Sequence, residues 1–312
     1  MLFRSHTLQA LKKWCYDHVS RDYQPTEHSY DAYLTLARYY LDDFLPRTTD
    51  INSQLIEDAT RYGFDHFLSS LRCDKALLNN TNAYQMTPLH IAASLGHEHT
   101  VHALLTHGAS PLARNAQEEL PIHRALLTPI DSDAEQIKKR TRIFHALLEK
   151  APDVLESTNN SGDTVFHLMA SQGFSNLLQA VVPDTYHHNH QLHYPIHIAI
   201  LNNQINAAKT LLSQEKVKSE LGPHDQNALH YATRYGIKTM VEACIKAMPD
   251  ALDAKDQSGK TPLILAAEAE NHDAIECLLT HGANKDCVDN YHKTFQDYID
   301  EKSNPTYRGG KR

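Results

Sequence analysis

The feature of this sequence that most constrains its fold is an internal repeat with a period near 33 residues. The segment "TPLHIAASLGHEHTVHALLTHGA" begins at Thr87, and "TPLILAAEAENHDAIECLLTHGA" begins at Thr261. Weaker echoes begin at Leu120, Thr164, Tyr194, Asn227 and Thr294. Successive starts are 33, 44, 30, 33, 34 and 33 residues apart. Units of this size cannot bury an apolar face alone, so they fold by stacking on their neighbours.

Each unit carries the signals of two helices. Thr87 and Thr261 are suited to cap a helix, and the proline after each suits the first turn. The motif position, fourth in each echo, holds His90, His123, His167, His197 and His230, and Glu57 occupies it one period upstream of His90. Small residues that allow close helix approach lie two places later: Ala59, Ala92, Ala125, Ala199, Ala232 and Ala266, with Met169 as the exception.

The ends of both helices are also marked. Six residues after the motif position are residues that tolerate a left-handed backbone: Gly63, Gly96, Gly173, Asn203 and Gly236. About fourteen residues after it, an apolar pair predicts a second amphipathic helix, as in Leu104-Leu105, Leu147-Leu148, Val181-Val182 and Leu211-Leu212. Eight residues before it are residues that favour a tight turn: Asn82, Asn115, Asn159, Asn189, Asp256 and Asp289.

This pattern resembles the ankyrin repeat from about residue 54 to residue 300. The resemblance implies an all-α solenoid of about six to seven helix-turn-helix units with projecting fingers and structural motif histidines. The expected units are 54–86, 87–119, 120–163, 164–193, 194–226, 227–260 and 261–293, with a partial unit at 294–300. The sequence departs from the pattern in three places. Leu120 and Tyr194 cannot cap a helix as threonine does, and Gly222 replaces the Asn/Asp turn residue. The second unit carries extra residues near 128–142, which are expected to form a loop or a lengthened helix.

The stretch "DTYHHNHQLHYPIH", residues 184–197, holds five histidines, and such a density could indicate a metal site. Yet His197 is a motif histidine, and His187, His188, His190 and His193 fall in one projecting finger, which favours a polar recognition finger. The basic run "KKRTR", residues 138–142, could be a nuclear-import signal, but a solvated helix face is favoured.

Residues 1–53 do not repeat and are expected to form a helical pair that caps the solenoid or serves as an accessory element. Cys15 and His18 lie three apart on one expected helix, but no base-orienting or oxyanion element accompanies them. The tail, residues 301–312, is expected to be disordered. No catalytic residue, metal site or cofactor is predicted.

Composition narrows the functional classes. A formal charge of −8 disfavours nucleic-acid and anionic-membrane partners. The chain has no apolar run of about 18 residues and no signal-peptide pattern. Five cysteines without a Cys-x-x-Cys pair indicate free thiols in a reducing compartment, so a cytoplasmic location is predicted, with delivery into host cytosol or nucleus as a further option.

The resemblance implies a protein partner held by finger tips and by the exposed side of the first helices. The residues predicted to make these contacts are Tyr84, Met86, Leu95, Gln117, Glu119, Leu127, His190, Gln191, His193, Leu201, Asn202, His224, Arg234 and Tyr235. The competing explanation for Leu95, Leu127 and Leu201 is packing between repeats. The degenerate repeats also resemble secreted ankyrin effectors of intracellular bacteria, so the leading hypothesis is a monomeric effector that acts on host proteins. A metal or thiol enzyme and a self-associating scaffold remain alternatives.

Overall fold

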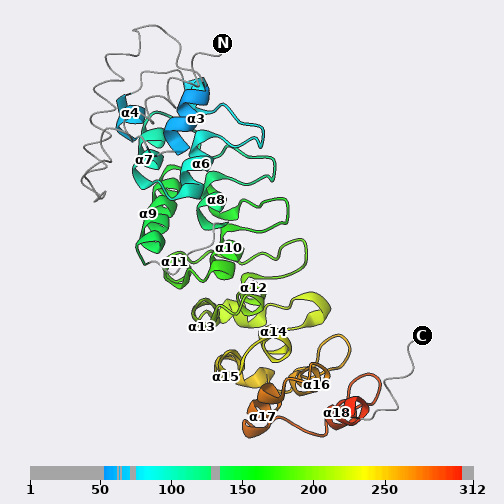
Figure 1. Ribbon diagram of the computed structural model, residues 1–312. Coiled ribbons are helices and arrows are strands. Elements are labelled where there is room, and N and C mark those ends of the chain that lie inside the picture. Colours follow the sequence, from blue (N-terminus) through cyan, green and yellow to red (C-terminus); the bar gives the residue numbers. More distant parts are fainter. Residues whose placement is uncertain (1–52, 62, 64, 71–74, 128–133, 304–312) are drawn as a thin grey trace, which may run out of the picture.

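The computed structural model describes residues 53–61, 63, 65–70, 75–127 and 134–303. Within these ranges every regular element is a helix, apart from one isolated bridge between Gly222 and Gln226. The helices form consecutive antiparallel pairs that stack along one axis, with residue 53 at one end and residue 303 at the other (Figure 1). The prediction of an all-α solenoid is confirmed.

Each unit contributes a first helix, a second helix and a connecting segment. The first helices are α3 (Ser53–Arg61), α6 (Pro88–Leu95), α8 (Pro121–Leu127), α10 (Val165–Gln172), α12 (Pro195–Leu201), α14 (Ala228–Tyr235), α16 (Pro262–Glu268) and α18 (Phe295–Ser303). The second helices are α4 (Asp65–Ser70), α7 (Glu98–Thr106), α9 (Ala134–Lys150), α11 (Ser175–Ala180), α13 (Ile205–Leu212), α15 (Lys238–Ala247) and α17 (His272–Thr280). Short helical turns lie in the connections: α5 (Lys75–Leu78), η1 (Pro152–Glu156), η2 (Glu215–Ser219), η3 (Pro223–Asp225) and η4 (Pro249–Ala251).

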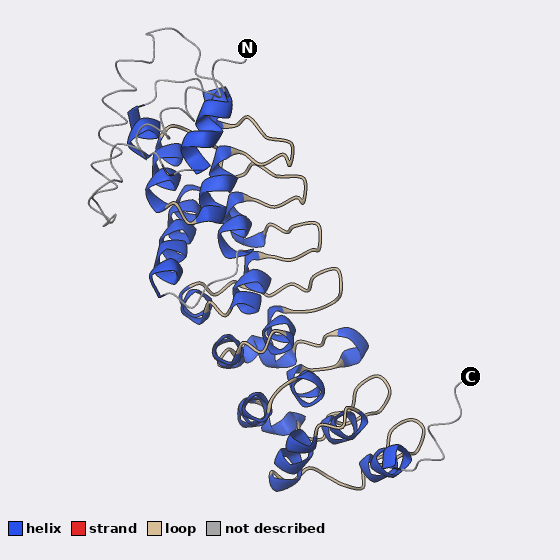
Figure 2. Ribbon diagram, in the orientation of Figure 1, coloured by secondary structure: helices blue, strands red, loops and turns tan. Residues whose placement is uncertain are grey.

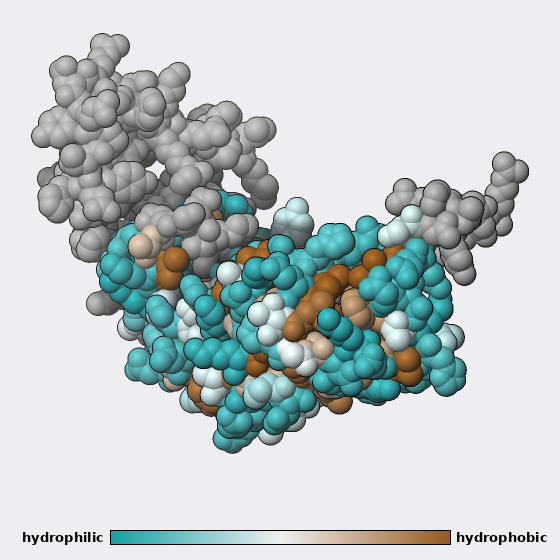
Figure 3. Space-filling model, turned by 90° about the horizontal axis from the view of Figure 1, so that it is seen from below, coloured by the Kyte–Doolittle hydropathy of each residue, from teal (hydrophilic) through white to brown (hydrophobic). Residues whose placement is uncertain are grey.

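The first helices form an inner layer between the second helices and the fingers. The fingers all project from the same side of the stack, as the loops in Figure 2 show. Seen from below the stack, the visible surface is mainly hydrophilic, and hydrophobic residues gather in a stripe (Figure 3). The unit expected upstream of Thr87 is present as α3 and α4, although its echo in the sequence is weak.

One continuous core runs through the described units. It is filled by the first-helix leucines and by the apolar pairs of the second helices, including Leu89, Leu104, Leu126 and Leu147. The small residues expected for close approach are fully buried, among them Ala92, Ala125, Ala199, Ala232 and Ala266. A larger side chain at these positions would push neighbouring first helices apart, because protein interiors are close-packed.

The third unit corrects one expectation from the sequence. Its buried second-helix pair is Leu177 and Leu178, whereas Val182 lies beyond the end of α11 and is exposed. The helix α11 has only 6 residues, and the unit, residues 164–193, is only 30 residues long. The missing residues amount to about one helical turn, so the apolar pair falls one turn earlier than the repeat spacing predicts.

The second unit carries its extra residues partly as helix. Its second helix, α9, has 17 residues, the longest among the described elements. The expectation of a lengthened helix is therefore confirmed for residues 134–150, while residues 128–133 lie outside the described part of the chain.

Helix ends follow the predicted chemistry with one exception. Gly63, Gly96, Gly173 and Asn203 all have positive φ. Gly236 does not, because its φ is −91°. Glycine is required there for another reason: a Cβ atom would lie 2.6 Å from the carbonyl oxygen of Ala232.

The motif histidine accepts a backbone N–H at the helix start in the units without threonine, as it does in those with it. The backbone N–H of Leu120 donates to Nδ1 of His123 at 3.0 Å, and that of Tyr194 donates to Nδ1 of His197 at 3.1 Å. The same imidazole therefore satisfies a helix-start donor whether or not a hydroxyl is present.

Several sequence expectations lie outside the described residues. These are the helical cap predicted for residues 1–53, of which only residue 53 is described, the Cys15–His18 pair, and residues 304–312 of the tail. The first three residues of the predicted disordered tail, 301–303, are helical and belong to α18. No helix within the described ranges has the length and apolar character needed to cross a bilayer.

Candidate binding surface

The finger turns are shaped by one Asn or Asp side chain in each regular unit. Oδ1 of Asn82 accepts hydrogen bonds from the backbone N–H of Tyr84 at 2.9 Å and of Met86 at 3.1 Å. Asn115, Asn159, Asn189, Asp256 and Asp289 make the same pair of bonds in their fingers. This Asx geometry holds the residues between these bonds at the tip.

Neighbouring fingers are joined by backbone hydrogen bonds. We call this series the finger ladder and each of its bonds a rung. The N–H of Ala116 donates to Tyr84, that of Asn160 to Gln117, and that of His190 to Ser161, with N–O distances of 3.0–3.2 Å. Two further rungs join Gln257 to His224 and Asn290 to Ser258. Within the described residues, no rung joins the fourth finger (189–194) to the fifth (222–227).

The fifth finger has a different turn because Gly222 replaces the Asn/Asp residue. The N–H of Gly222 donates to the carbonyl of Gln226, and both His224 and Asp225 have positive φ. Two consecutive non-glycine residues in this region are conformationally costly and give this finger a shape of its own. His224 is exposed at its tip.

The motif histidines are structural, as the resemblance implied. Nε2 of His90 lies 3.0 Å from the carbonyl oxygen of Glu119, Nε2 of His167 lies 2.9 Å from that of His193, and Nε2 of His230 lies 3.3 Å from that of Lys260. His123 contacts the carbonyl of Ser157 at 3.1 Å. His197 is the exception, since its Nε2 makes no hydrogen bond within the described residues.

Burial keeps these imidazoles neutral. Desolvation lowers the pKa of His123 to about 4 and that of His197 to about 3. Burial also lowers the pKa of His90, His167 and His230. These buried rings are thus kept neutral and are not available as ligands on the surface.

Most of the predicted contact residues are exposed. Among the apolar and aromatic ones, Tyr84 is 68% exposed, Leu95 46%, Leu201 40% and Tyr235 52%. The exposed polar members of the set are Gln117, His190, Gln191, Asn202, His224 and Arg234. These side chains lie on the finger tips or at the ends of the first helices. Pure packing between repeats therefore does not account for Leu95 and Leu201.

Three predicted residues are only partly accessible. Met86, Leu127 and His193 are half-buried, and Leu127 packs against the core. For Leu127 the competing explanation, packing between repeats, fits the structure better than a contact with a partner.

Glu119 was wrongly predicted to contact a partner. It is 6% exposed, and its Oε2 accepts from Nδ2 of Asn115 at 2.7 Å. Arg124 approaches the same oxygen at 3.5 Å. The carboxylate is thus engaged within its own unit, where it joins the second finger to α8.

An aromatic cluster lies between the fourth and fifth units. Tyr231 packs edge-on against His193 at 5.6 Å between ring centroids, and Tyr235 continues the cluster at 5.9 Å. The guanidinium of Arg234 lies over the Tyr235 ring at 5.5 Å. Nδ1 of His193 is buried and has no hydrogen-bond partner within the described residues. The cluster thus combines exposed aromatic surface with one unused polar atom.

The sequence analysis missed other exposed side chains. Tyr291 is 73% exposed at the last finger, two residues after Asp289, as Tyr84 is two residues after Asn82. Leu192 is exposed on the fourth finger. Applying the Asn/Asp spacing to the partial unit would have identified Tyr291.

The histidine-rich stretch is dispersed by the fold. His187 pairs with Glu156 at 3.2 Å on the surface, and Nδ1 of His188 contacts the carbonyl of Asn189. His190 is exposed and His197 is buried. Across the part of the chain that is described, no three His, Cys, Asp or Glu side chains are grouped as a metal ion would need.

The basic run at 138–142 is divided by the fold. Lys138 and Arg142 are exposed, but Arg140 is buried. Its Nη1 donates to the carbonyl of Ala125 at 2.7 Å and its Nη2 to that of Ser94 at 3.2 Å. The expected solvated face was therefore wrong for Arg140, which binds the C-terminal ends of two first helices.

Comparison with known proteins agrees with this architecture. Residues 84–116 match the ankyrin repeat model, and residues 216–289 match the model for three ankyrin repeat copies. The ankyrin repeat domain of human ASB11 superimposes with a TM-score of 0.58 at 19% identity, covering 73% of this chain and 98% of that one. The ankyrin repeat domain of Bcl-3 gives 0.57 at 23% identity, covering 72% and 97%.

The curated relatives are longer proteins. A transient receptor potential channel A1 homolog of Caenorhabditis elegans is 26% identical over 208 residues, which is 66% of this chain and 16% of the relative. Human B-cell lymphoma 3 protein is 28% identical over 141 residues, which is 42% of this chain and 31% of the relative. The alignments thus span less than a third of either relative.

Two segments of the chain thus match ankyrin repeats, and the described fold resembles that of solved ankyrin repeat domains. Neither matching family model is a catalytic one.

Proposed function

We propose that this chain is a non-enzymatic module that binds a partner protein through its finger tips and the exposed side of its first helices. The observation that carries the proposal is the exposure of Tyr84, Leu95, Leu201 and Tyr235 at contact positions of three units. Aromatic side chains surrounded by polar residues are typical anchors of protein interfaces. Single exposed apolar residues are ordinary, but their recurrence on one side of the stack is not.

The aromatic cluster at the fourth and fifth units is the proposed centre of this surface. Tyr235 offers an exposed ring, Arg234 adds a charge that can pair with a carboxylate, and Leu201 extends the apolar area. A tyrosine ring makes a large contact at a small cost in side-chain entropy. We expect the partner to present apolar side chains together with an acidic group.

The test is a comparison of three forms of the full chain on a resin without metal. The first is the wild type, the second carries Tyr84→Glu and Tyr235→Glu, and the third carries Ile237→Glu as a control with similar exposure. Captured proteins are identified from a eukaryotic lysate and then purified for direct affinity measurement. We expect the double variant to lose at least tenfold in affinity and the control to bind as the wild type does. Equal affinity of the double variant would place the contact elsewhere.

Two narrower statements belong to the proposal. One is the effector role: a bacterial protein acting on host proteins, for which the animal relatives described above offer no support. Delivery of a tagged chain into host cells during infection would test it. The other is a monomeric state, tested by light scattering; a dimer that dissociates when Tyr235 is charged would instead favour the self-associating scaffold.

A further inference from the structure

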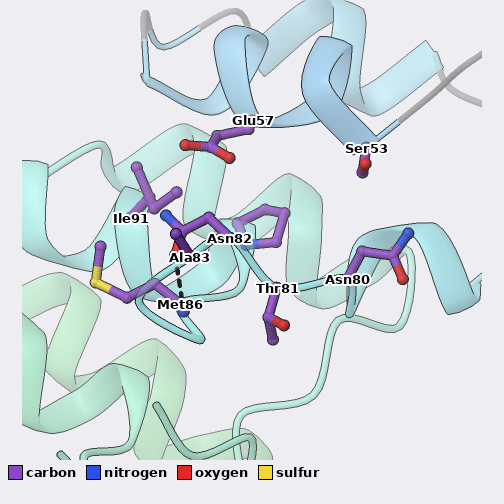
Figure 4. Close-up of a pocket in the computed structure, with 9 residues that line it drawn as sticks. Ser53, Glu57, Asn80, Thr81, Asn82, Ala83, Met86 and Ile91 are labelled. Atoms are coloured by element: carbon purple, nitrogen blue, oxygen red, sulfur yellow. Dashed lines mark hydrogen bonds between the residues drawn. The ribbon is translucent and has the colours of Figure 1, made fainter. Parts of the chain in front are cut away.

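A pocket of about 200 Å³ lies between the first described helix and the first finger. Figure 4 shows the Glu57 side chain reaching from α3 toward the finger, with Ile91 and the finger residues below it. The finger wall is held in shape by the bond from the N–H of Met86 to Oδ1 of Asn82.

The pocket lies in the unit whose motif position holds a glutamate in place of the histidine found in other units. In the units led by His90, His167 and His230, the motif imidazole reaches the carbonyl of the residue directly before the next helix start: Glu119, His193 or Lys260. In the first described unit the motif position holds Glu57, and the equivalent carbonyl is that of Met86.

This substitution removes the hydrogen-bond donor of the bridge. The carbonyl of Glu119 accepts from both Asn115 and His90, whereas the carbonyl of Met86 accepts only from the N–H of Asn82, at 3.1 Å, among the described residues. An ionised carboxylate has no proton to donate, so Glu57 and the Met86 carbonyl are both acceptors. Two acceptors thus face the space that an imidazole fills in other units.

The pocket wall contains one carboxylate. Glu57 is the sole ionisable side chain among the lining residues, and it is 17% exposed. Arg61 donates to its Oε1 at 2.6 Å from outside the lining, and Oε2 has no donor among the described residues. The hydroxyls of Ser53 and Thr81 add polar groups on one side of the pocket.

The other side of the pocket is apolar. Met86, Pro88 and Ile91 contribute hydrocarbon surface. A ligand that fits both sides has a cationic donor at one end and an alkyl stem at the other. A primary ammonium supplies three donors on a flexible stem.

We propose that this pocket binds a primary alkylammonium group, which donates to Glu57 and to the Met86 carbonyl while its stem packs on Met86, Pro88 and Ile91. The group can be a lysine side chain of a bound protein or a free alkylamine. The pocket shares Met86 with the predicted contact residues, but neither Tyr84 nor Tyr235, the two residues changed to test the proposed function, lines it.

The test is an NMR titration of the full chain with n-butylammonium, with 1-butanol as the uncharged probe. We expect butylammonium to shift the amide signals of Thr81, Met86 and Ile91 and butanol to leave them unchanged. Glu57→Gln weakens butylammonium binding by about tenfold, since it removes a charge-assisted hydrogen bond. Glu149→Gln, an exposed glutamate on α9, is the matched control and binds as the wild type does.

A second variant tests the origin of the pocket. Glu57→His restores the donor, so the imidazole should bond to the Met86 carbonyl, raise the unfolding midpoint and abolish butylammonium binding. A short peptide with one lysine, compared with its norleucine analogue and with spermidine, then identifies the source of the amine. Equal butylammonium binding by wild type and Glu57→Gln, equal effects of butanol, or no shift up to about 50 mM butylammonium overturns the proposal.

Discussion

Nε2 of His90 lies 3.0 Å from the carbonyl oxygen of Glu119, while Nδ1 of the same ring accepts the backbone N–H of Thr87 at 3.2 Å. One imidazole thus joins its own helix start to the following finger. These partners require a proton on Nε2 and none on Nδ1. Protonating the ring would remove the acceptor, so the stack depends on neutral histidines.

The first prediction concerns pH. The folded-state pKa of His123 is lowered by burial to about 4, below the ordinary value of 6.5. The unfolded chain therefore binds protons first as the pH falls, and stability that is complete above about 6.5 is lost progressively toward about 4. Urea unfolding at pH 7.5 and pH 5 should show a clear loss of unfolding free energy.

A matched pair assigns this pH effect. His123→Asn should lower stability at pH 7.5 and reduce its dependence on pH. His99→Asn, at an exposed position on α7, removes a histidine without disturbing a bridge and should leave both quantities unchanged. An unaltered pH dependence in the His123 variant would contradict the prediction.

The second prediction concerns Glu119. Glu119→Ala leaves Nδ2 of the buried Asn115 without its acceptor, so it should destabilise the chain by about 1–3 kcal/mol. Gln117→Ala, two residues away and exposed, should change stability by less than about 0.5 kcal/mol. Denaturant midpoints compare the two, and equal values would mean that Glu119 is not structural.

The third prediction concerns Arg140. Arg140→Met keeps the long stem but removes the donors to Ala125 and Ser94, and we expect a loss of about 1.5–3 kcal/mol. Arg142→Met removes an exposed pair with Glu98, which water screens, and should cost clearly less than Arg140→Met. Thermal unfolding of both variants provides the measurement. A larger effect at Arg142 would refute the assignment.

The fourth prediction concerns the C-terminal end of the stack. The hydroxyl of Tyr298 donates to Oδ2 of Asp289 at 2.6 Å, tying α18 to the last finger. Tyr298→Phe should speed amide hydrogen exchange in α18 by about tenfold while leaving α10 unchanged, because terminal elements open locally. Tyr291→Phe, at an exposed tip, serves as control.

Local spacing predicted the helix pairs, the Asx turns and the bridging histidines because each depends on residues within one unit or its neighbour. Arg140 could not be predicted, since its burial depends on where α9 crosses the ends of α6 and α8. Glu119 has the polar character of a surface residue, and only its orientation toward Asn115 shows its role. Val182 was misplaced because the third unit is one turn short.

The finger ladder is interrupted between the fourth and fifth fingers, where the rung that joins other neighbours is absent from the described residues. Helix packing and side-chain contacts, such as those of His193 with Tyr231 and of Tyr186 with Gln214, join the units across this seam. We expect bending of the solenoid to concentrate there, with the group of fingers on each side of the seam moving as a unit. A partner that binds fingers on both sides of the seam must fix the angle between the two groups and loses affinity to that ordering. A partner that binds fingers on one side does not.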